Sequence, residues 1–300
     1  MRWLKYSFLT LTLFLLGPAY MAAYGSDSHD ATPAPVFAKR NSSGMAPLPD
    51  EYSGAMIQVY AARTSSWRSH LAVHTWVATK ERDADHFVVH QVIGFRARRN
   101  LPVVVSEADL PDRFWYGNAP ELLADIRGEQ AEKLLPEVLA AIDSYPFQDD
   151  YSIWPGPNCN TFTAYIGRAV PELQLTLPVT AIGKDYLPDG KMIEDAPSGT
   201  GYQFSLFGLF GMTAARDEGL EINILGLSAG VDFLRPALKL PGVGRVGMSA
   251  AISGASSPAD LAFAAEETDD NETSTADIFR TADQANVLAN GIVSVDDSRL

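Results

Sequence analysis

A rigid turn, Trp154-Pro-Gly-Pro-Asn158, constrains this sequence more than any other feature, because it fixes where a helix must begin. Proline and glycine do not continue a helix or a central strand, and asparagine is a favoured N-cap residue. The residues that follow repeat apolar side chains at helical spacing: Phe162, Tyr165, Ile166, Ala169 and Val170. The sequence therefore predicts a helix that starts at Cys159, the only cysteine of the chain.

Cys159 would lie in the first turn of this helix. There the exposed N–H groups and the positive end of the helix dipole favour a thiolate, so we expect a lowered thiol pKa and a candidate nucleophile. The alternative is a small buried apolar residue, which is the commoner role of a lone cysteine. A nucleophilic thiolate also needs a base, and histidine is the usual one.

The histidines are concentrated in one predicted hairpin, formed by Leu71–Thr79 and His86–Phe95. If the last residue of the first strand pairs with Asp85, His74 lies directly opposite His90. His74 is then the candidate base for Cys159, and His90 is the candidate residue that orients it. Because they lie on predicted strands, the histidines form no helical i, i+4 pair, and they lack the cysteine or carboxylate partners of a zinc site, so we expect no metal and no other cofactor.

The N-terminus, residues 1–25, is typical of an export signal. Arg2 and Lys5 precede the apolar run Phe8–Leu16, and small residues follow before a cleavage point at Ser26. Two alternatives stay open: a cleaved signal, or a retained anchor formed by residues 6–24 in the inner membrane. Either alternative predicts a protein exported to the periplasm or cell envelope, with its N-terminal segment as a candidate membrane attachment.

Charge and composition divide the rest of the chain. The net charge of −14 argues against nucleic acid as a partner, because phosphates require basic patches. Much of the negative charge lies in residues 251–300, which we expect to be a disordered tail. Residues 26–50 are rich in proline, serine and alanine and indicate a linker. The folded part is then a domain over 51–200 followed by an appendage over 201–250.

The appendage has its own pattern. Short apolar runs, Phe204–Phe210, Leu220–Leu227 and Ala229–Leu234, alternate with glycine or charged turns. This pattern predicts a β-meander that forms a second sheet or a face laid on another molecule. In the domain before it, the pattern predicts two further strands and two helices: Met56–Ala62, Val103–Val105, Pro120–Arg127 and Glu129–Ser144.

Two resemblances to known families follow from these residues. Asn158-Cys-Asn-Thr-Phe162 resembles the Asn-Cys-Asn-x-Phe signature of the permuted papain-like families, the PPPDE and lecithin retinol acyltransferase groups. In that resemblance His74 corresponds to the first histidine of those families and His90 to the second histidine of the acyltransferase type. More of the chain, roughly Ile57 to Gly247, is similar to a bacterial family known as domain of unknown function 3750. That similarity implies no activity.

Together these features predict an α+β fold, in which an antiparallel sheet carries packed helices in the permuted papain-like manner and a β-meander follows. The first hypothesis is a cysteine-dependent amide or ester hydrolase or acyl transferase of the cell envelope, acting on an unknown peptide, cell-wall or lipid-like substrate. Cys159 would attack a carbonyl, His74 would carry the proton and His90 would orient His74. The alternative is a non-catalytic envelope protein that binds a partner through the aromatic loop Asp109–Gly117 or the meander.

Overall fold

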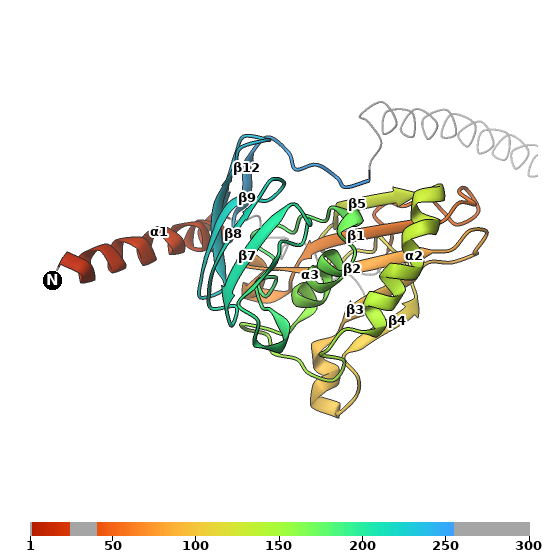
Figure 1. Ribbon diagram of the computed structural model, residues 1–300, viewed down its shortest axis with the longest axis horizontal. Helices are drawn as coiled ribbons and strands as arrows, with labels where there is room; N and C mark the ends of the chain where they lie inside the picture. Colours follow the sequence, from red (N-terminus) through yellow and green to blue (C-terminus); the bar gives the residue numbers. More distant parts are fainter. Residues whose placement is uncertain (1, 25–40, 255–300) are drawn as a thin grey trace, which may run out of the picture. The chain divides into compact units, whose positions relative to one another are not determined.

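The computed structural model describes residues 2–24 and 41–254 and has an α+β fold (Figure 1). Residues 26–40 of the predicted linker and 255–300 of the predicted tail lie outside the described residues. The main elements, in chain order, are α1 (Arg2–Tyr24), β1 (Met56–Arg63), β2 (Val73–Lys80), β3 (Val88–Val92), β4 (Val104–Ala108), β5 (Glu121–Arg127), α2 (Gly128–Asp143), α3 (Cys159–Ala169), β6 (Ile193–Asp195), β7 (Gly201–Leu206), β8 (Phe210–Ala215), β9 (Gly219–Ile224), β10 (Leu227–Asp232), β11 (Ala237–Leu240) and β12 (Gly244–Gly247).

The first sheet is five-stranded and antiparallel, with the order β4-β3-β2-β1-β5. Because successive strand residues point to opposite faces, each strand contributes to two apolar layers. Ile57 and Val59 point to the face on which α2 and α3 pack, and together they form the larger core. Tyr60 and Trp76 point to the opposite face and stack with ring centroids 5.6 Å apart. Both faces of this sheet are therefore covered.

The second face is covered by the aromatic loop and by the end of the predicted linker. Trp76 donates its indole N–H to the backbone oxygen of Pro111 at 2.7 Å. Asp112, in the same loop, accepts hydrogen bonds from the hydroxyls of Ser42 and Ser43 at 2.8 and 3.1 Å. The last residues of the predicted linker therefore pack against the domain.

The turn before α3 explains why the helix begins where the sequence predicts. The Asn158 side chain accepts hydrogen bonds from the backbone N–H groups of Asn160 and Thr161, and the Thr161 hydroxyl accepts one from the backbone N–H of Asn158. This reciprocal capping box satisfies N–H groups that have no partner inside the helix. The peptide bonds preceding Pro155 and Pro157 are both cis. The predicted start at Cys159 is confirmed.

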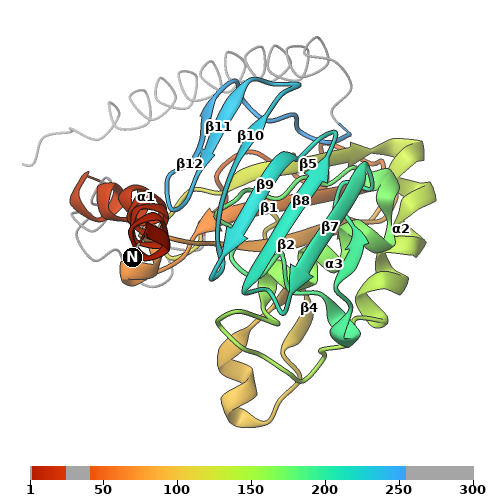
Figure 2. The ribbon, with the colours of Figure 1, turned by 60° about the vertical axis from the view of Figure 1, so that its left-hand side comes forward.

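The second sheet is a seven-stranded β-meander, in which every strand from β6 to β12 pairs antiparallel with its sequence neighbour. Figure 2 shows β7, β8 and β9 lying in front of β2 and α3. The predicted meander is confirmed.

Two local predictions were wrong. Residues 121–127 form strand β5 instead of part of a helix over Pro120–Arg127, because the free edge of β1 needs an antiparallel partner for its buried backbone groups. The hairpin register also differs. β2 continues to Lys80 and β3 begins only at Val88, so Val77 lies opposite His90 and His74 does not.

Candidate functional site

Cys159 is buried at the start of α3, with 9% of its surface exposed, and its Sγ lies 3.8 Å from Asn160 Oδ1. Burial raises the pKa of this thiol to about 11, although backbone hydrogen bonds oppose the shift. A helix dipole contributes about 0.3–1 kcal/mol, which is less than one pKa unit, so burial dominates. The effect is opposite to the lowered pKa expected from the helix start, and Cys159 is a neutral thiol at neutral pH.

His74 lies on the other face of the five-stranded sheet. Its neighbour Thr75 points toward α3 and donates a hydrogen bond to Asn160 Oδ1 at 3.0 Å. Since adjacent strand residues point to opposite faces, the His74 ring points away from α3. It stacks on Trp115 with centroids 4.0 Å apart, and its Nε2 lies 3.1 Å from Gln91 Oε1. The structure therefore does not bring His74 and Cys159 together.

His90 occupies a third environment. Its Nε2 lies 2.9 Å from the Thr79 hydroxyl and its Nδ1 lies 2.7 Å from the Ser106 hydroxyl, so both ring nitrogens contact groups of neighbouring strands. Burial lowers the pKa of His74 and of His90 to about 4, which keeps both imidazoles neutral at neutral pH. The three candidate residues thus take part in separate hydrogen-bond networks.

Within the described ranges 2–24 and 41–254, no three histidine, cysteine, aspartate or glutamate side chains are grouped in a way that could hold a metal ion. In that same part of the chain, no helix has both the length and the apolar character needed to cross a membrane.

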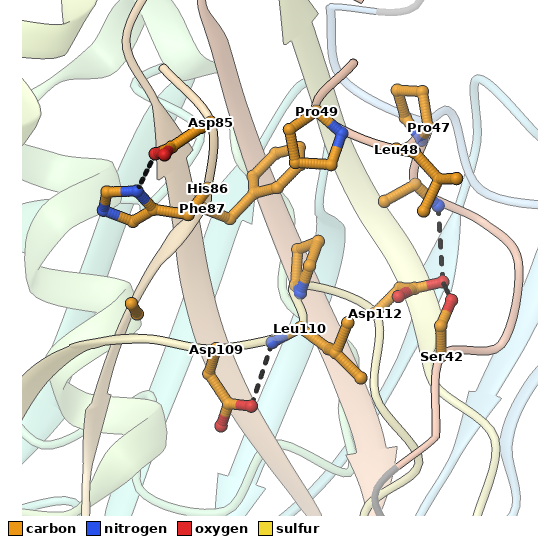
Figure 3. Close-up of a pocket in the computed structure, with 13 residues that line it drawn as sticks. Ser42, Pro47, Leu48, Pro49, Asp85, His86, Phe87, Asp109, Leu110 and Asp112 are labelled. Atoms are coloured by element: carbon orange, nitrogen blue, oxygen red, sulfur yellow. Dashed lines mark hydrogen bonds and ion pairs between the residues drawn. The ribbon is translucent and has the colours of Figure 1, made fainter. Parts of the chain in front are cut away.

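A cavity of about 390 Å³ lies between the end of the predicted linker and the aromatic loop (Figure 3). Its Asp85 and His86 side chains pair at 2.5 Å and are exposed. Asp112 also lines the cavity, but its carboxylate already accepts hydrogen bonds from Ser42, Ser43 and the backbone N–H of Met45. The remaining walls are largely apolar, including Pro47, Leu48, Pro49, Phe87, Leu110 and Pro111. This cavity has few free polar groups that converge on one point.

The inner face of the meander, by contrast, buries a network of charges. Glu221 accepts from Lys184 at 2.7 Å and from Lys239 at 2.6 Å, and Lys184 also lies 3.3 Å from Asp185. Gly230 stands between Glu221 and Lys239 in the register, so no side chain separates the pair. The other buried inner-face side chains are polar as well: Gln203, Ser205, Thr213, Asn223, Ser228 and Asp232.

The ionised states in this network stabilise one another. Burial by itself lowers the pKa of Lys184, but Asp185 and Glu221 outweigh it and hold that pKa above its usual range. Burial likewise tends to raise the pKa of Glu221, and the two lysines outweigh it and hold that pKa below its usual value. The network attaches the meander to Lys184 and Asp185, in the segment between α3 and β6.

The outer face of the meander is apolar and exposed. Strand β9 shows the alternation: Leu220 and Ile222 are exposed, whereas Glu221 and Asn223 are buried. The same alternation runs through the neighbouring strands, so we define the outer face by its exposed side chains: Tyr202, Leu206, Phe210, Met212, Leu220, Ile222, Leu238, Leu240 and Val246. At the β6 edge of the sheet, Asp195 lies opposite Tyr202 and adds one exposed acidic side chain to this face. In Figure 2, β7, β8 and β9 lie in front of α3, so the side of these strands that faces the viewer is the side away from α3.

Apolar side chains also form the tips of two hairpins at one end of the meander. Phe207 in the β7–β8 turn is 60% exposed, and Leu225 in the β9–β10 turn is 54% exposed. A backbone hydrogen bond from Leu225 to Leu209 joins the two turns at 2.5 Å. Trp154, from the turn before α3, donates to the Leu225 oxygen at 2.9 Å and remains half-exposed. The outer face thus continues into an apolar end.

The comparisons with known proteins identify one family. Residues 54–186 match the family described as "Protein of unknown function (DUF3750)". No curated protein and no solved structure matches the chain, so the permuted papain-like resemblance stays a prediction. The match includes the five-stranded sheet with α2 and α3 and ends before β6, so it is shorter than the similarity seen in the sequence. Over residues 54–186 the chain is similar to the DUF3750 family, whose function is unknown.

Proposed function

We propose that this chain is a non-catalytic protein of the cell envelope that docks on a partner through the outer face of its β-meander. The observation that carries the proposal is the inverted polarity of this sheet, with charged and polar side chains buried and apolar side chains exposed. Apolar surface left in water forgoes about 25 cal/mol per Å² of stabilisation. Contiguous apolar surface of this kind marks interaction sites in soluble proteins.

The fold itself does not require an apolar outer face. The meander is attached to the domain through its inner face, by contacts such as the Lys184 ammonium with the Glu221 carboxylate at 2.7 Å. The exposed side chains of Met212 and Ile222 contribute little to that attachment. A partner that covers them would supply the missing burial.

The cysteine hydrolase hypothesis gains less support from the geometry. Its nucleophile is a buried thiol with a raised pKa, and its base lies across the sheet. The expected location in the envelope rests on the N-terminal sequence, where Arg2 and Lys5 precede an apolar run.

The proposal is tested by measuring whether the outer face is covered in the cell. Two full-length variants each carry one new cysteine: Ile222→Cys on the outer face, and Phe95→Cys as a control at a similarly exposed apolar position in the 3₁₀ helix Gly94–Arg99. A membrane-permeant maleimide is applied to intact cells and to the purified proteins, and the unsubstituted chain gives the background from buried Cys159. We expect residue 222 to react in the purified protein and to be protected in cells, while residue 95 reacts in both. Equal reactivity of residues 222 and 95 in cells contradicts the proposal.

A second measurement tests the cysteine hypothesis directly. Iodoacetamide should alkylate Cys159 of the folded protein slowly throughout the neutral range, because the thiol pKa is raised. Rapid alkylation well below pH 8.5 that is lost in His74→Ala would instead support a cysteine–histidine pair.

A further inference from the structure

We infer that the partner of the outer face is a lipid bilayer, against which the meander lies with its apolar end inserted. The inference rests on the proposed function and names what covers the face. It is carried by the chemistry of the face, by the conformation of its hairpin turns and by the residues that surround them.

The outer face offers hydrocarbon contacts almost alone. Acidic and basic residues make up 20% of the chain, yet among the described residues of β7 to β12 the exposed outer-face side chains are uncharged, and Asp195 of β6 brings an acidic group only to the edge of the face. Tyr202 supplies the single hydroxyl of that set. Protein–protein interfaces are only about 56–65% non-polar and carry on the order of ten hydrogen bonds. A face whose polar groups are confined to Tyr202 and Asp195 at one edge matches acyl chains, which need no hydrogen-bond partners, better than it matches a second protein.

The hairpin turns carry apolar residues where the backbone favours polar ones. Phe207 and Gly208 have φ of 54° and 70°, and Leu225 and Gly226 have φ of 53° and 80°. Two consecutive positive φ values define a turn that prefers Asn-Gly or Asp-Gly, and a bulky side chain is strained in this region. Because both side chains are exposed, neither their conformation nor burial within the fold accounts for their presence. Insertion into an apolar phase does account for it.

Trp154 and Ile153 extend the apolar end beyond the two turns. Both are about half-exposed, and the indole N–H of Trp154 is already hydrogen-bonded to Leu225. Tryptophan with a satisfied N–H fits the boundary between headgroups and acyl chains, where its amphipathic ring is enriched. Four large apolar side chains, Ile153, Trp154, Phe207 and Leu225, therefore converge on one exposed end.

The experiment uses the full-length protein with a polarity-sensitive fluorophore on Ile222→Cys, on Leu225→Cys or, as the matched control, on Phe95→Cys. Phosphatidylcholine vesicles are added at low and at high salt. We expect a blue shift and a several-fold rise in emission at residues 222 and 225 and no change at residue 95. The response should persist at high salt, because burial of apolar surface is not screened. Vesicle binding through α1 alone would leave all three probes unchanged.

A turn variant separates lipid contact from folding. Phe207→Asn with Leu225→Asn installs the residue that these turns favour, so the fold should be retained or stabilised. Fully burying one such side chain is worth roughly a tenfold change in partitioning or more, so the double variant labelled at residue 222 should bind vesicles at least about tenfold more weakly.

The alternatives give different results. Probes at 222 and 225 that stay in a water-like environment with vesicles overturn the lipid inference. If they are instead shielded without vesicles as protein concentration rises, the occupant is a second copy of this chain. If they are shielded only in cells, the occupant is another protein. In both cases the proposed docking function survives, whereas lack of protection in cells removes that function itself.

Discussion

The two sheets of this protein use the same alternation of side chains for opposite purposes. In the five-stranded sheet, alternate residues such as Val59 and Tyr60 both enter apolar layers, because α2 and α3 cover one face and the aromatic loop covers the other. In the meander, alternate residues such as Glu221 and Ile222 enter a buried polar network and an exposed apolar face. Both faces of the first sheet are covered, whereas within residues 2–24 and 41–254 no element covers the apolar layer of the second.

The two sheets also bury ionisable groups in different states. The five-stranded sheet holds His74 and His90 neutral, with pKa values lowered by burial to about 4. The network under the meander holds Glu221 and Lys184 ionised, because each charge compensates the other. We therefore expect the stability of the first sheet to fall when its histidines are protonated, and the stability of the second to fall when one member of its buried ion pairs is removed. Three predictions test it.

The largest effect should come from acid. Unfolded histidine binds a proton below pH 6.5, whereas the folded sheet resists protonation until about pH 4, so the unfolded state binds more protons in this window. Stability is therefore fully present above pH 6.5 and is lost as the pH falls toward 4. The loss is on the order of 3 kcal/mol for each histidine and about twice that for both. Urea unfolding measured across this range gives the slope.

A matched pair of variants identifies the source of the slope. His74→Gln should flatten the profile between pH 6 and 5 by about one proton, whatever its effect on absolute stability. His86→Gln is the matched control, at an exposed histidine that precedes β3. An unchanged slope in His74→Gln would show that His74 is accessible to protons in the folded state.

The second effect concerns the buried charges of the meander. Glu221→Gln keeps the shape of the side chain but leaves Lys184 and Lys239 without their shared carboxylate. Removing one member of a buried ion pair typically costs about 3–5 kcal/mol. Glu132→Ala removes an exposed partner of Arg82 and should cost less than about 1 kcal/mol. Similar losses of unfolding free energy in the two variants would show that the Glu221 network is open to water.

Local sequence features predicted the elements whose geometry is set by neighbouring residues. The Asn158 cap and the prolines before it predicted α3, and the short apolar runs broken by glycine or charged turns predicted the meander. Strand β5 was missed because Asn118 and Pro120 are helix-start signals, whereas the strand depends on pairing with distant β1. The inner network was visible only as alternating Glu221 and Asn223, with nothing in sequence to pair them with Lys184.

The candidate site depended more on tertiary structure than on local pattern. Whether a cysteine at a helix start is a thiolate depends on what packs over it, and here Cys159 shares an apolar cluster with Tyr145 and Phe162. Whether His74 faces that cysteine depends on which alternate residues of β2 point toward α3. Thr75 points toward α3, so its neighbour His74 points to the opposite face. The spacing of residues along the sequence predicts neither the packing over Cys159 nor the face to which His74 points.

The smallest effect compares one residue type in the two sheets. Ile57 in β1 is fully buried in the larger core, and Ile222 in β9 is 42% exposed on the outer face. Ile57→Ala should lower the unfolding free energy by about 3 kcal/mol through lost burial and the cavity left behind. Ile222→Ala should change it by less than about 1 kcal/mol in water, since the side chain gains little there on folding. Urea denaturation of the two variants without lipid measures the difference. A loss at Ile222 as large as that at Ile57 would mean that its side chain is buried within the protein itself, and the outer face would then belong to the core instead of being free for a partner.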